Sequence, residues 1–396
     1  MIRRVAVCLL TMVLLTGCWN RRELNDLAIV VGMGIDKIGD RYEVTIQVVM
    51  PAEVAPLKGG TSGRAPVTIY HATGDTVFEA IRRMTTMTPR KAYFAHVRMF
   101  LIGEEAAKAG ISNLLDFISR DHELRTDFYF AVARGAMARD LLSIYTMLEK
   151  IPANKMFNSI EVSQKTWAPS VSVTLDELIR DLVSNGKNPV LTGIEIVGNK
   201  EEGKLKSNVE RIDLPTKVQY TGLAVFKKDK LVGWLDEYES KGYSDITDKL
   251  QSTVIEVACP QGGKLGVEII RSKTTMNPEV KDGKPAMRLK TRSEANISDV
   301  ECKIDVTKSG TIDELEKKIE DKMRMNSRSS IKKAQKLNSD IFGFGSSFHL
   351  NYPSYWDKIE QHWDRYFQQL PVHLDVEVTI KRLGTIGEPL QNKIKE

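Results

Sequence analysis

Leu27-Ala28-Ile29-Val30-Val31-Gly32-Met33-Gly34-Ile35-Asp36 is the stretch from which the fold of this chain can first be predicted. Its first five residues are a continuous apolar run, typical of a buried strand, and the glycines after them predict a turn out of that strand. Between Tyr42 and Val48 apolar and polar residues alternate, which predicts a second strand with one buried face. Because Gly39-Asp40 lies between the two runs, we expect a hairpin.

Strand and helix patterns alternate through the rest of the first half. A proline- and glycine-rich loop is predicted at 51–66, and Asp75 or Thr76 is predicted to cap the helix that follows the next strand. Further strands are predicted at 67–71, 93–102, 128–133 and 190–197. Helical segments are predicted at 104–117 (broken at Gly110) and 141–181 (interrupted at Pro152 and Pro169). This alternation predicts an α/β domain.

The second half shows a different pattern. A hairpin is predicted at 221–226 and 231–235, followed by a short helix and by three strands that we expect to be antiparallel, at 253–258, 265–274 and 286–295. A long helix is predicted at 311–337, with a weak point at 326–330. Pro353 begins a last helix, and a final strand is predicted at 372–380. The aromatic stripe of that helix, predicted to seal the C-terminal sheet, consists of Trp356, Ile359, Trp363, Tyr366 and Phe367.

A charged, glycine-punctuated segment at 199–207 separates the two halves. We therefore predict a signal peptide at 1–17, an N-terminal domain at 18–200 and a C-terminal domain at 201–396. The expected fold class is α/β, or α+β overall, with an N-terminal mixed-sheet α/β domain followed by one or more antiparallel-sheet domains packed with helices.

The beginning of the chain has the pattern of a bacterial lipoprotein signal. Arg3 and Arg4 precede an apolar run at 5–15, and small residues precede Cys18. The run is about half of the ~20 residues that a membrane-spanning helix needs. We expect the mature chain to begin at Cys18, with a diacylglyceryl group on its sulfur and an acyl group on its amino group, on the extracytoplasmic face of a membrane. The alternative is an ordinary secretion signal with a cysteine at the cleavage site.

Composition is that of a folded protein with 42% apolar and 28% charged residues. The formal net charge is +5, and removal of residues 1–17 would leave +3 because only two arginines are lost. Basic residues are interleaved with acidic ones along the chain, so nucleic acid is not an indicated partner. Cys259 and Cys302 could form one disulfide or remain free thiols, and no Cys/His spacing indicates a zinc site.

Motifs with catalytic or cofactor chemistry are incomplete. The glycines at 32 and 34 begin a dinucleotide fingerprint, but Lys37 stands where the third glycine is needed. The glycines at 59–63 lack the Gly-Lys-Ser/Thr ending of a phosphate loop. Asp121-His122-Glu123 offers acid–base groups, yet its position between a helix and a strand favours a solvated connection. We therefore expect no catalytic, cofactor-binding or metal-binding residues, and no enzymatic activity.

An ordered series of short stretches runs along the chain. It consists of Gly17-Cys18-Trp19-Asn20-Arg21-Arg22-Glu23-Leu24 with 27–36, His96-Val97-Arg98, 102–106, Gly110-Ile111, Arg120-Asp121 with Glu123-Leu124-Arg125, Asp340-Ile341-Phe342-Gly343-Phe344-Gly345, Pro353, Trp356, Trp363 and the last strand up to Gly384. This series resembles the Ger(x)C lipoproteins, the C subunits of spore germinant receptors. The chain departs from the family pattern at Asn20, where an aspartate is usual, and at His122.

The resemblance implies a non-enzymatic subunit that is lipid-anchored on the spore inner membrane and acts with two membrane-embedded partners, the A and B subunits, to trigger germination in response to small nutrients. It also implies three α/β domains, so the C-terminal half is expected to divide again near residue 260. The exposed segments 51–66 and 120–127 are the expected partner contacts. Two competing hypotheses are a solute-binding lipoprotein that delivers a nutrient to a transporter, and a cell-wall hydrolase.

Overall fold

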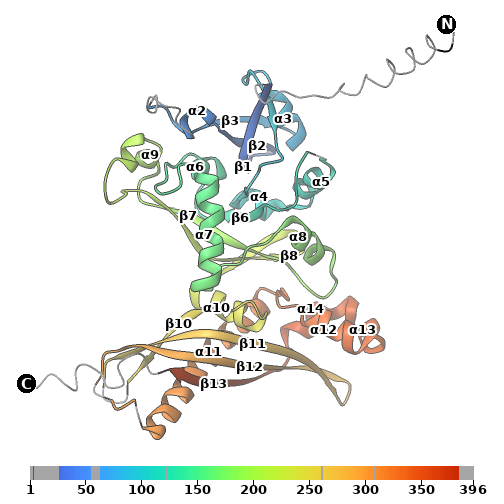
Figure 1. The fold of residues 1–396 in the computed structure, drawn as a ribbon. Helices are drawn as coiled ribbons and strands as arrows, with labels where there is room; N and C mark the ends of the chain where they lie inside the picture. Colours follow the sequence, from blue (N-terminus) through green and yellow to red (C-terminus); the bar gives the residue numbers. More distant parts are fainter. Residues whose placement is uncertain are drawn as a thin grey trace, which may run out of the picture.

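The computed structural model describes residue 3 and residues 26–54, 63–121, 123–259, 262–302, 304–306 and 308–382. Within these residues the chain forms two sheets, one above the other in Figure 1. The predicted fold class, a mixed α/β sheet followed by a largely antiparallel one, is confirmed.

The first sheet has nine strands. They are β1 (Leu27–Ile38), β2 (Arg41–Val49), β3 (Val67–Gly74), β4 (Lys91–Tyr93), β5 (Met99–Gly103), β6 (Tyr129–Ala133), β7 (Val190–Val197), β8 (Lys217–Lys227) and β9 (Lys230–Leu235). Their order is β3-β2-β1-β5-β6-β7-β8-β9, and β4 pairs with β1. The central strands β1, β5, β6 and β7 run parallel, whereas the hairpins at both ends are antiparallel, so the sheet is mixed.

Eight helices within the described residues accompany this sheet. They are α2 (Pro51–Val54), α3 (Val77–Met84), α4 (Glu104–Ala109), α5 (Ser112–Arg120), α6 (Ala138–Leu142), α7 (Pro152–Thr166), α8 (Leu175–Val183) and α9 (Lys200–Gly203). Of the two predicted caps, Thr76 is the one that caps α3, because its hydroxyl accepts the N–H of Glu79 at 3.1 Å. Gly110, with φ 123°, separates α4 from α5 as predicted.

The predicted turn at the glycines of 32–34 is wrong, because β1 continues through them to Ile38. A Cβ on Gly32 would lie 2.9 Å from Leu142, and a Cβ on Gly34 would lie 2.9 Å from Ala138. The glycines therefore allow α6 to approach the strand closely. Asp36 fixes the same contact, since its carboxylate accepts the N–H groups of residues 138 and 139 at the start of α6.

The single strand predicted at 93–102 is in fact two strands, β4 and β5, with His96 exposed in the turn between them. Both strands pair in parallel with β1, β4 with residues 27–29 and β5 with residues 32–35. The register of β1 against β2 shifts between Val30 and Gly32. On the other side of β1, the gap between β4 and β5 lies beside this irregularity.

The second sheet contains β10 (Thr253–Ala258), β11 (Lys264–Lys281), β12 (Lys284–Val300) and β13 (Val372–Arg382), in that order. The predicted antiparallel pairing of the first three is confirmed. However, β13 lies parallel to β12, because the long helix α11 (Ser309–Lys336) carries the chain back across the sheet. Glu316 and Glu320 of α11 accept the N–H groups of Ile380 and Val378, which lie on the edge strand.

The first sheet does not end at the predicted boundary near residue 200. The predicted hairpin at 221–235 is present as β8 and β9, but it extends the first sheet, and Val197 pairs with Lys217 across the boundary segment. The change from one sheet to the other occurs at α10 (Glu237–Ile246). A further division near residue 260 would separate β10 from β11, which are paired in one sheet.

The predicted weak point at 326–330 is absent, since α11 is continuous through it. The small polar residues there face α10: a Cβ on Gly242 would lie 2.4 Å from the carbonyl oxygen of Asn326. Ser327 donates a hydrogen bond to the buried carboxylate of Asp245, and Ser272 of β11 donates another. These residues therefore form a close helix crossing rather than a break.

The buried carboxylate of Asp245 at this crossing leads to a prediction of how the free energy of unfolding depends on pH. Burial raises the pKa of Asp245 from 3.8 to about 6, against the two serine hydrogen bonds that lower it. The folded state then binds this proton more tightly than the unfolded chain does, so ionisation between about pH 4 and 6 destabilises the fold by up to roughly 3 kcal/mol. We expect Asp245→Asn to become more stable relative to the unsubstituted protein as the pH rises through that window, measured by urea unfolding. A stability difference that does not vary with pH would contradict this, and Asp357→Asn, at an exposed position, is the control.

The predicted aromatic helix is broken into three pieces. After α12 (Phe344–Asn351) come α13 (Pro353–Ile359), a 3₁₀ turn at Glu360–His362 and α14 (Trp363–Gln368). Trp356 and Trp363 are buried as predicted, whereas Tyr366 is 37% exposed.

The aromatic residues of α13 and α14 also belong to a core that includes residues of the first sheet and its helices. Leu178 of α8, Phe226 of β8, Met287 of β12 and Trp356 of α13 belong to one continuous apolar cluster. In Figure 1, α10 and α12–α14 lie between the two sheets. The two halves of the chain therefore share a core.

Asp340 is the polar centre of this shared core. Its buried carboxylate accepts five N–H groups, which are those of Phe342 (3.2 Å), Gly343 (3.0 Å), Phe344 (3.1 Å) and Gly345 (2.8 Å) and the indole of Trp363 (2.9 Å). Burial raises the pKa of this carboxyl to about 6, although each of these hydrogen bonds favours the ionised form. A single side chain thus accepts the N–H groups of four consecutive residues, 342–345.

The glycines of the same segment permit contact between the two halves. A Cβ on Gly345 would lie 2.7 Å from the Cα of Gly186 and 2.7 Å from the indole nitrogen of Trp363. Ser346 donates its N–H to the carbonyl oxygen of Gly186 at 3.1 Å. The backbone of the α8–β7 connection therefore rests directly on the start of α12.

Candidate functional site

An apolar groove with a volume of about 310 Å³ lies at the rim of the first sheet, between α3, α5 and β4. We call it the α3–α5 groove. Its walls are mostly apolar and its rim is charged. The lining residues are Ile46, Phe78, Ile81, Arg82, Met84, Thr85, Thr88, Lys91, Ala92, Phe94, Phe117, Arg120, Asp121 and Glu123.

The groove exists because one aromatic residue of α3 does not face the core. Val77, Ala80 and Met84 form the buried face of the helix. Phe78 lies outside that face and is 51% exposed, and its ring centroid is 6.2 Å from that of Phe117 on α5. The guanidinium of Arg82, one turn further along α3, lies 4.8 Å from the Phe78 ring centroid. The two helices thus present an aromatic wall to solvent.

The acidic groups of the rim are occupied by local partners. Lys91 forms an ion pair with Glu123 at 2.6 Å, and the carboxylate of Asp121 accepts the N–H of Glu123. Arg120 pairs with Asp116, and this hydrogen bond holds the pKa of Asp116 below its usual range. His122 lies outside the described residues. The contacts of Asp121 and Glu123 are those of a charged connection between α5 and β6, as predicted from the sequence.

The groove lies beside the start of β1. Leu27 pairs with Lys91 and Ile29 pairs with Tyr93, so the first described strand begins at the edge of the groove. Cys18 is only nine residues before Leu27 and lies outside the described residues. Nine residues span at most about 30 Å, which limits the distance between Cys18 and the groove edge.

A second, polar cleft of about 720 Å³ lies between the two halves, lined by residues of α5, α8, the β8–β9 turn and α14. Several charged side chains that line this cleft already form ion pairs. The Nζ of Lys227 lies 2.7 Å from the Oδ2 of Asp364, and the Nζ of Lys187 lies 2.9 Å from the Oδ2 of Asp181. The cleft therefore has the character of a solvated domain junction.

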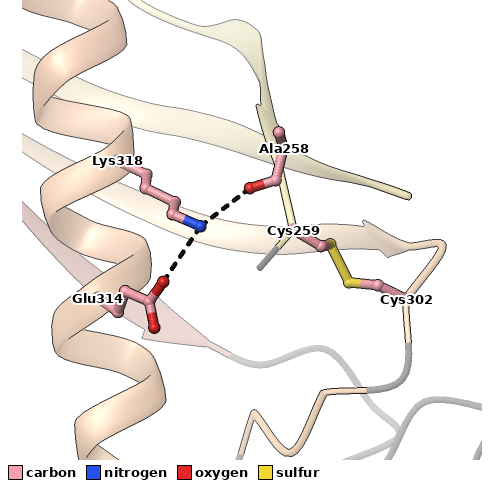
Figure 2. Close-up of a disulfide and its surroundings, with 5 residues drawn as sticks. All are labelled: Ala258, Cys259, Cys302, Glu314 and Lys318. Carbon is pink, nitrogen blue, oxygen red and sulfur yellow. Dashed lines mark hydrogen bonds and ion pairs between the residues drawn. A yellow bond between two sulfur atoms is a disulfide. The ribbon is translucent and has the colours of Figure 1, made fainter. Parts of the chain in front are cut away.

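The remaining candidates from the sequence are placed as follows. Cys259 and Cys302, whose pairing the sequence left open, form a disulfide with a Cα–Cα distance of 6.4 Å. Figure 2 shows this bond beside Lys318 of α11, which donates to the carbonyl oxygen of Ala258 and pairs with Glu314. Of the loop 51–66, residues 51–54 form α2 and residues 55–62 lie outside the described part.

The described residues offer neither a metal site nor a membrane-spanning helix. They contain no group of three or more His, Cys, Asp or Glu side chains suited to hold a metal ion. No helix among them has the length and apolar character that would let it cross a bilayer.

The sequence prediction missed most of the groove. It identified the rim segment 120–127 but not Phe78, Phe94 or Phe117, which come from three separate elements. One signal was available, because Phe78 is the aromatic residue of α3 that does not fit the helix's apolar face. The convergence of the three elements depends on the pairing of β4 with β1, which is not visible locally.

Comparison with known proteins gives consistent results over both halves of the chain. Residues 20–196 match the family described as spore germination protein N-terminal domain, and residues 221–384 match the family described as spore germination B3/GerAC like, C-terminal. Spore germination protein KC of Bacillus subtilis is 31% identical, over 98% of this chain and 97% of that protein. The putative spore germination protein YfkR of the same organism is 28% identical, over 97% of each chain.

A solved structure shows the same fold. The crystal structure of the GerBC protein matches with a TM-score of 0.54 and 20% identity, over 88% of this chain and 96% of that chain. At this identity the match supports the architecture of the two sheets alone.

Proposed function

Because this chain belongs to the Ger(x)C family of spore germination proteins, we propose that it is the lipid-anchored, non-enzymatic C subunit of a nutrient germinant receptor. In this proposal it acts with the A and B membrane subunits to trigger germination, and it is held on the outer face of the spore inner membrane through Cys18. The observation that carries the proposal is the similarity to spore germination protein KC over nearly the whole length of both chains.

The structure supports a binding role over a catalytic one. The carboxylates that the sequence offered for acid–base chemistry are engaged in an ion pair and in a backbone hydrogen bond at the groove rim. The two sheets also differ in size and strand order, which does not favour the two similar lobes of a solute-binding lipoprotein.

The lipid at Cys18 supplies the physical basis for assembly. A tethered protein meets membrane-embedded partners at a raised effective concentration, so modest interfaces suffice for binding. In this proposal the partner contacts lie in the segments 51–66 and 120–127, and Arg120, Asp121 and Glu123 of the second segment form part of the rim of the α3–α5 groove.

Cys18→Ala tests the anchor. The substitution removes the lipidation site and leaves the folded body unchanged, so we expect the protein to be lost from the spore membrane fraction and the rate of nutrient-triggered germination to fall by roughly tenfold or more, as expected for loss of a tether. The measurement is the optical-density decrease of spores that carry the variant as their only copy.

Cys8→Ala is the matched control, because Cys8 lies in the apolar run of the signal and not at the cleavage position. It should germinate normally. Full activity and normal membrane retention of Cys18→Ala would overturn the proposed anchoring.

A further inference from the structure

The exposed surface of α3 and of the turn that follows it combines apolar side chains with positive charges that have no ion-pair partner among the described residues. Phe78 and Met87 are each 51% exposed. Arg82 and Arg90 lie beside them, and no carboxylate in the part of the chain that the structure describes lies within ion-pair distance of either guanidinium. The other basic groups nearby are neutralised: Arg83 by Glu79, and Lys91 and Arg120 by the partners given above.

Such a combination is typical of surfaces that lie in the interface of a membrane. Aromatic and aliphatic side chains enter the boundary between headgroups and acyl chains, and arginines interact with anionic headgroups. The α3–α5 groove adds an apolar hollow of about 310 Å³ directly next to these side chains. A hollow of this size is suited to part of an acyl chain.

The position of this face along the chain agrees with a membrane contact. Leu27 is paired with Lys91 on the groove rim, and it is the ninth residue after Cys18. With a lipid on Cys18, which is part of the proposed function, the groove edge cannot lie farther than about 30 Å from the anchored residue.

We propose that the face formed by Phe78, Arg82, Met87 and Arg90, together with the α3–α5 groove, is a second membrane contact that binds anionic phospholipid. The lipid anchor limits the distance of the protein from the bilayer, and this face fixes its orientation. The first sheet then lies toward the membrane and the second sheet away from it.

The test uses residues 19–396, the mature chain without the lipid, so that binding does not depend on Cys18. We expect it to cosediment with vesicles of phosphatidylcholine and phosphatidylglycerol in equal parts, to bind pure phosphatidylcholine far more weakly, and to lose affinity as salt is added. Arg82→Gln with Arg90→Gln should weaken binding by about twenty-fivefold, roughly fivefold for each arginine. Phe78→Ser should weaken it by about tenfold.

Matched controls come from the second half of the chain. Arg328→Gln with Arg365→Gln changes two arginines that are also exposed, and Leu350→Ser changes an apolar residue that is 83% exposed. These variants should bind vesicles as the unsubstituted chain does, and all variants should keep its thermal midpoint because the changed side chains lie at the surface.

Three outcomes would overturn the proposal. They are equal binding to both vesicle types, binding unaffected by the substitutions at Phe78, Arg82 and Arg90, and full displacement by inorganic phosphate at an ionic strength held constant with sodium chloride, which would indicate a site for a soluble anion instead of a membrane. Because this measurement is made without the lipid, its failure is distinguishable from failure of the Cys18→Ala test in spores.

Discussion

Asp340→Ala is expected to lower the free energy of unfolding by about 4 kcal/mol, the largest effect of any single substitution that we predict. The change leaves five N–H donors without their acceptor, four in the backbone of 342–345 and one on Trp363. Hydrogen bonds to a charged group are worth about 1.5–3 kcal/mol each, and buried donors left unpaired have a full desolvation cost. Urea unfolding followed by tryptophan fluorescence measures the loss, since Trp356 and Trp363 pack beside the site.

Asp357→Ala is the control for this experiment, because its side chain is exposed on α13. It should change stability by less than about 0.5 kcal/mol. If Asp340→Ala cost less than about 1 kcal/mol, the assignment of Asp340 as the centre of the shared core would have to be abandoned.

Replacement of both cysteines, Cys259→Ala with Cys302→Ala, is expected to lower the free energy of unfolding by up to about 4 kcal/mol. The disulfide joins the end of β10 to the segment after β12 and closes a loop with a sequence separation of 43. Loss of this restraint increases the entropy of the unfolded chain by an amount that corresponds to the stated energy. Both residues are buried within the core of the second sheet, so a small cavity adds to the effect.

Reduction of the disulfide in the unsubstituted protein is the comparison for the double-cysteine variant. Dithiothreitol should destabilise the unsubstituted protein and leave the double variant unaffected, so that the two unfold at similar urea concentrations in reducing buffer. Equal stability of the two proteins under oxidising conditions would contradict a structural role for the bond. Such a disulfide is the kind of bond expected at the extracytoplasmic location proposed above.

Several parts of the fold could be predicted from the sequence because their signals are local. The strand at Tyr42–Val48, the cap at Thr76 and the break at Gly110 depend on neighbouring residues, and the structure has all three. The predicted exposure of the polar face of that strand is wrong, because Glu43, Thr45 and Gln47 are buried. The family could be recognised from short ordered stretches, and comparison confirms it over nearly the whole chain.

Other parts depend on contacts between distant segments, and the prediction failed there. The glycines at 32 and 34 were interpreted as a turn because the helix that packs on them lies about a hundred residues further on. The polar run at 326–330 was interpreted as a weak point because its partner, Gly242 of α10, is not visible locally. The parallel placement of β13 and the three-element groove likewise require knowledge of the folded chain.

The core shared by the two sheets has a mechanical consequence. A clamshell protein responds to a signal by bending at a hinge, but here the apolar cluster continues from α8 and β8 into β12 and α13, and bending would have to separate those residues. A force applied at α3 would therefore move the two sheets together as one rigid body. The tip of the long β11–β12 hairpin moves with it, since Tyr355 of α13 donates a hydrogen bond to the carbonyl oxygen of Gly283 at that tip.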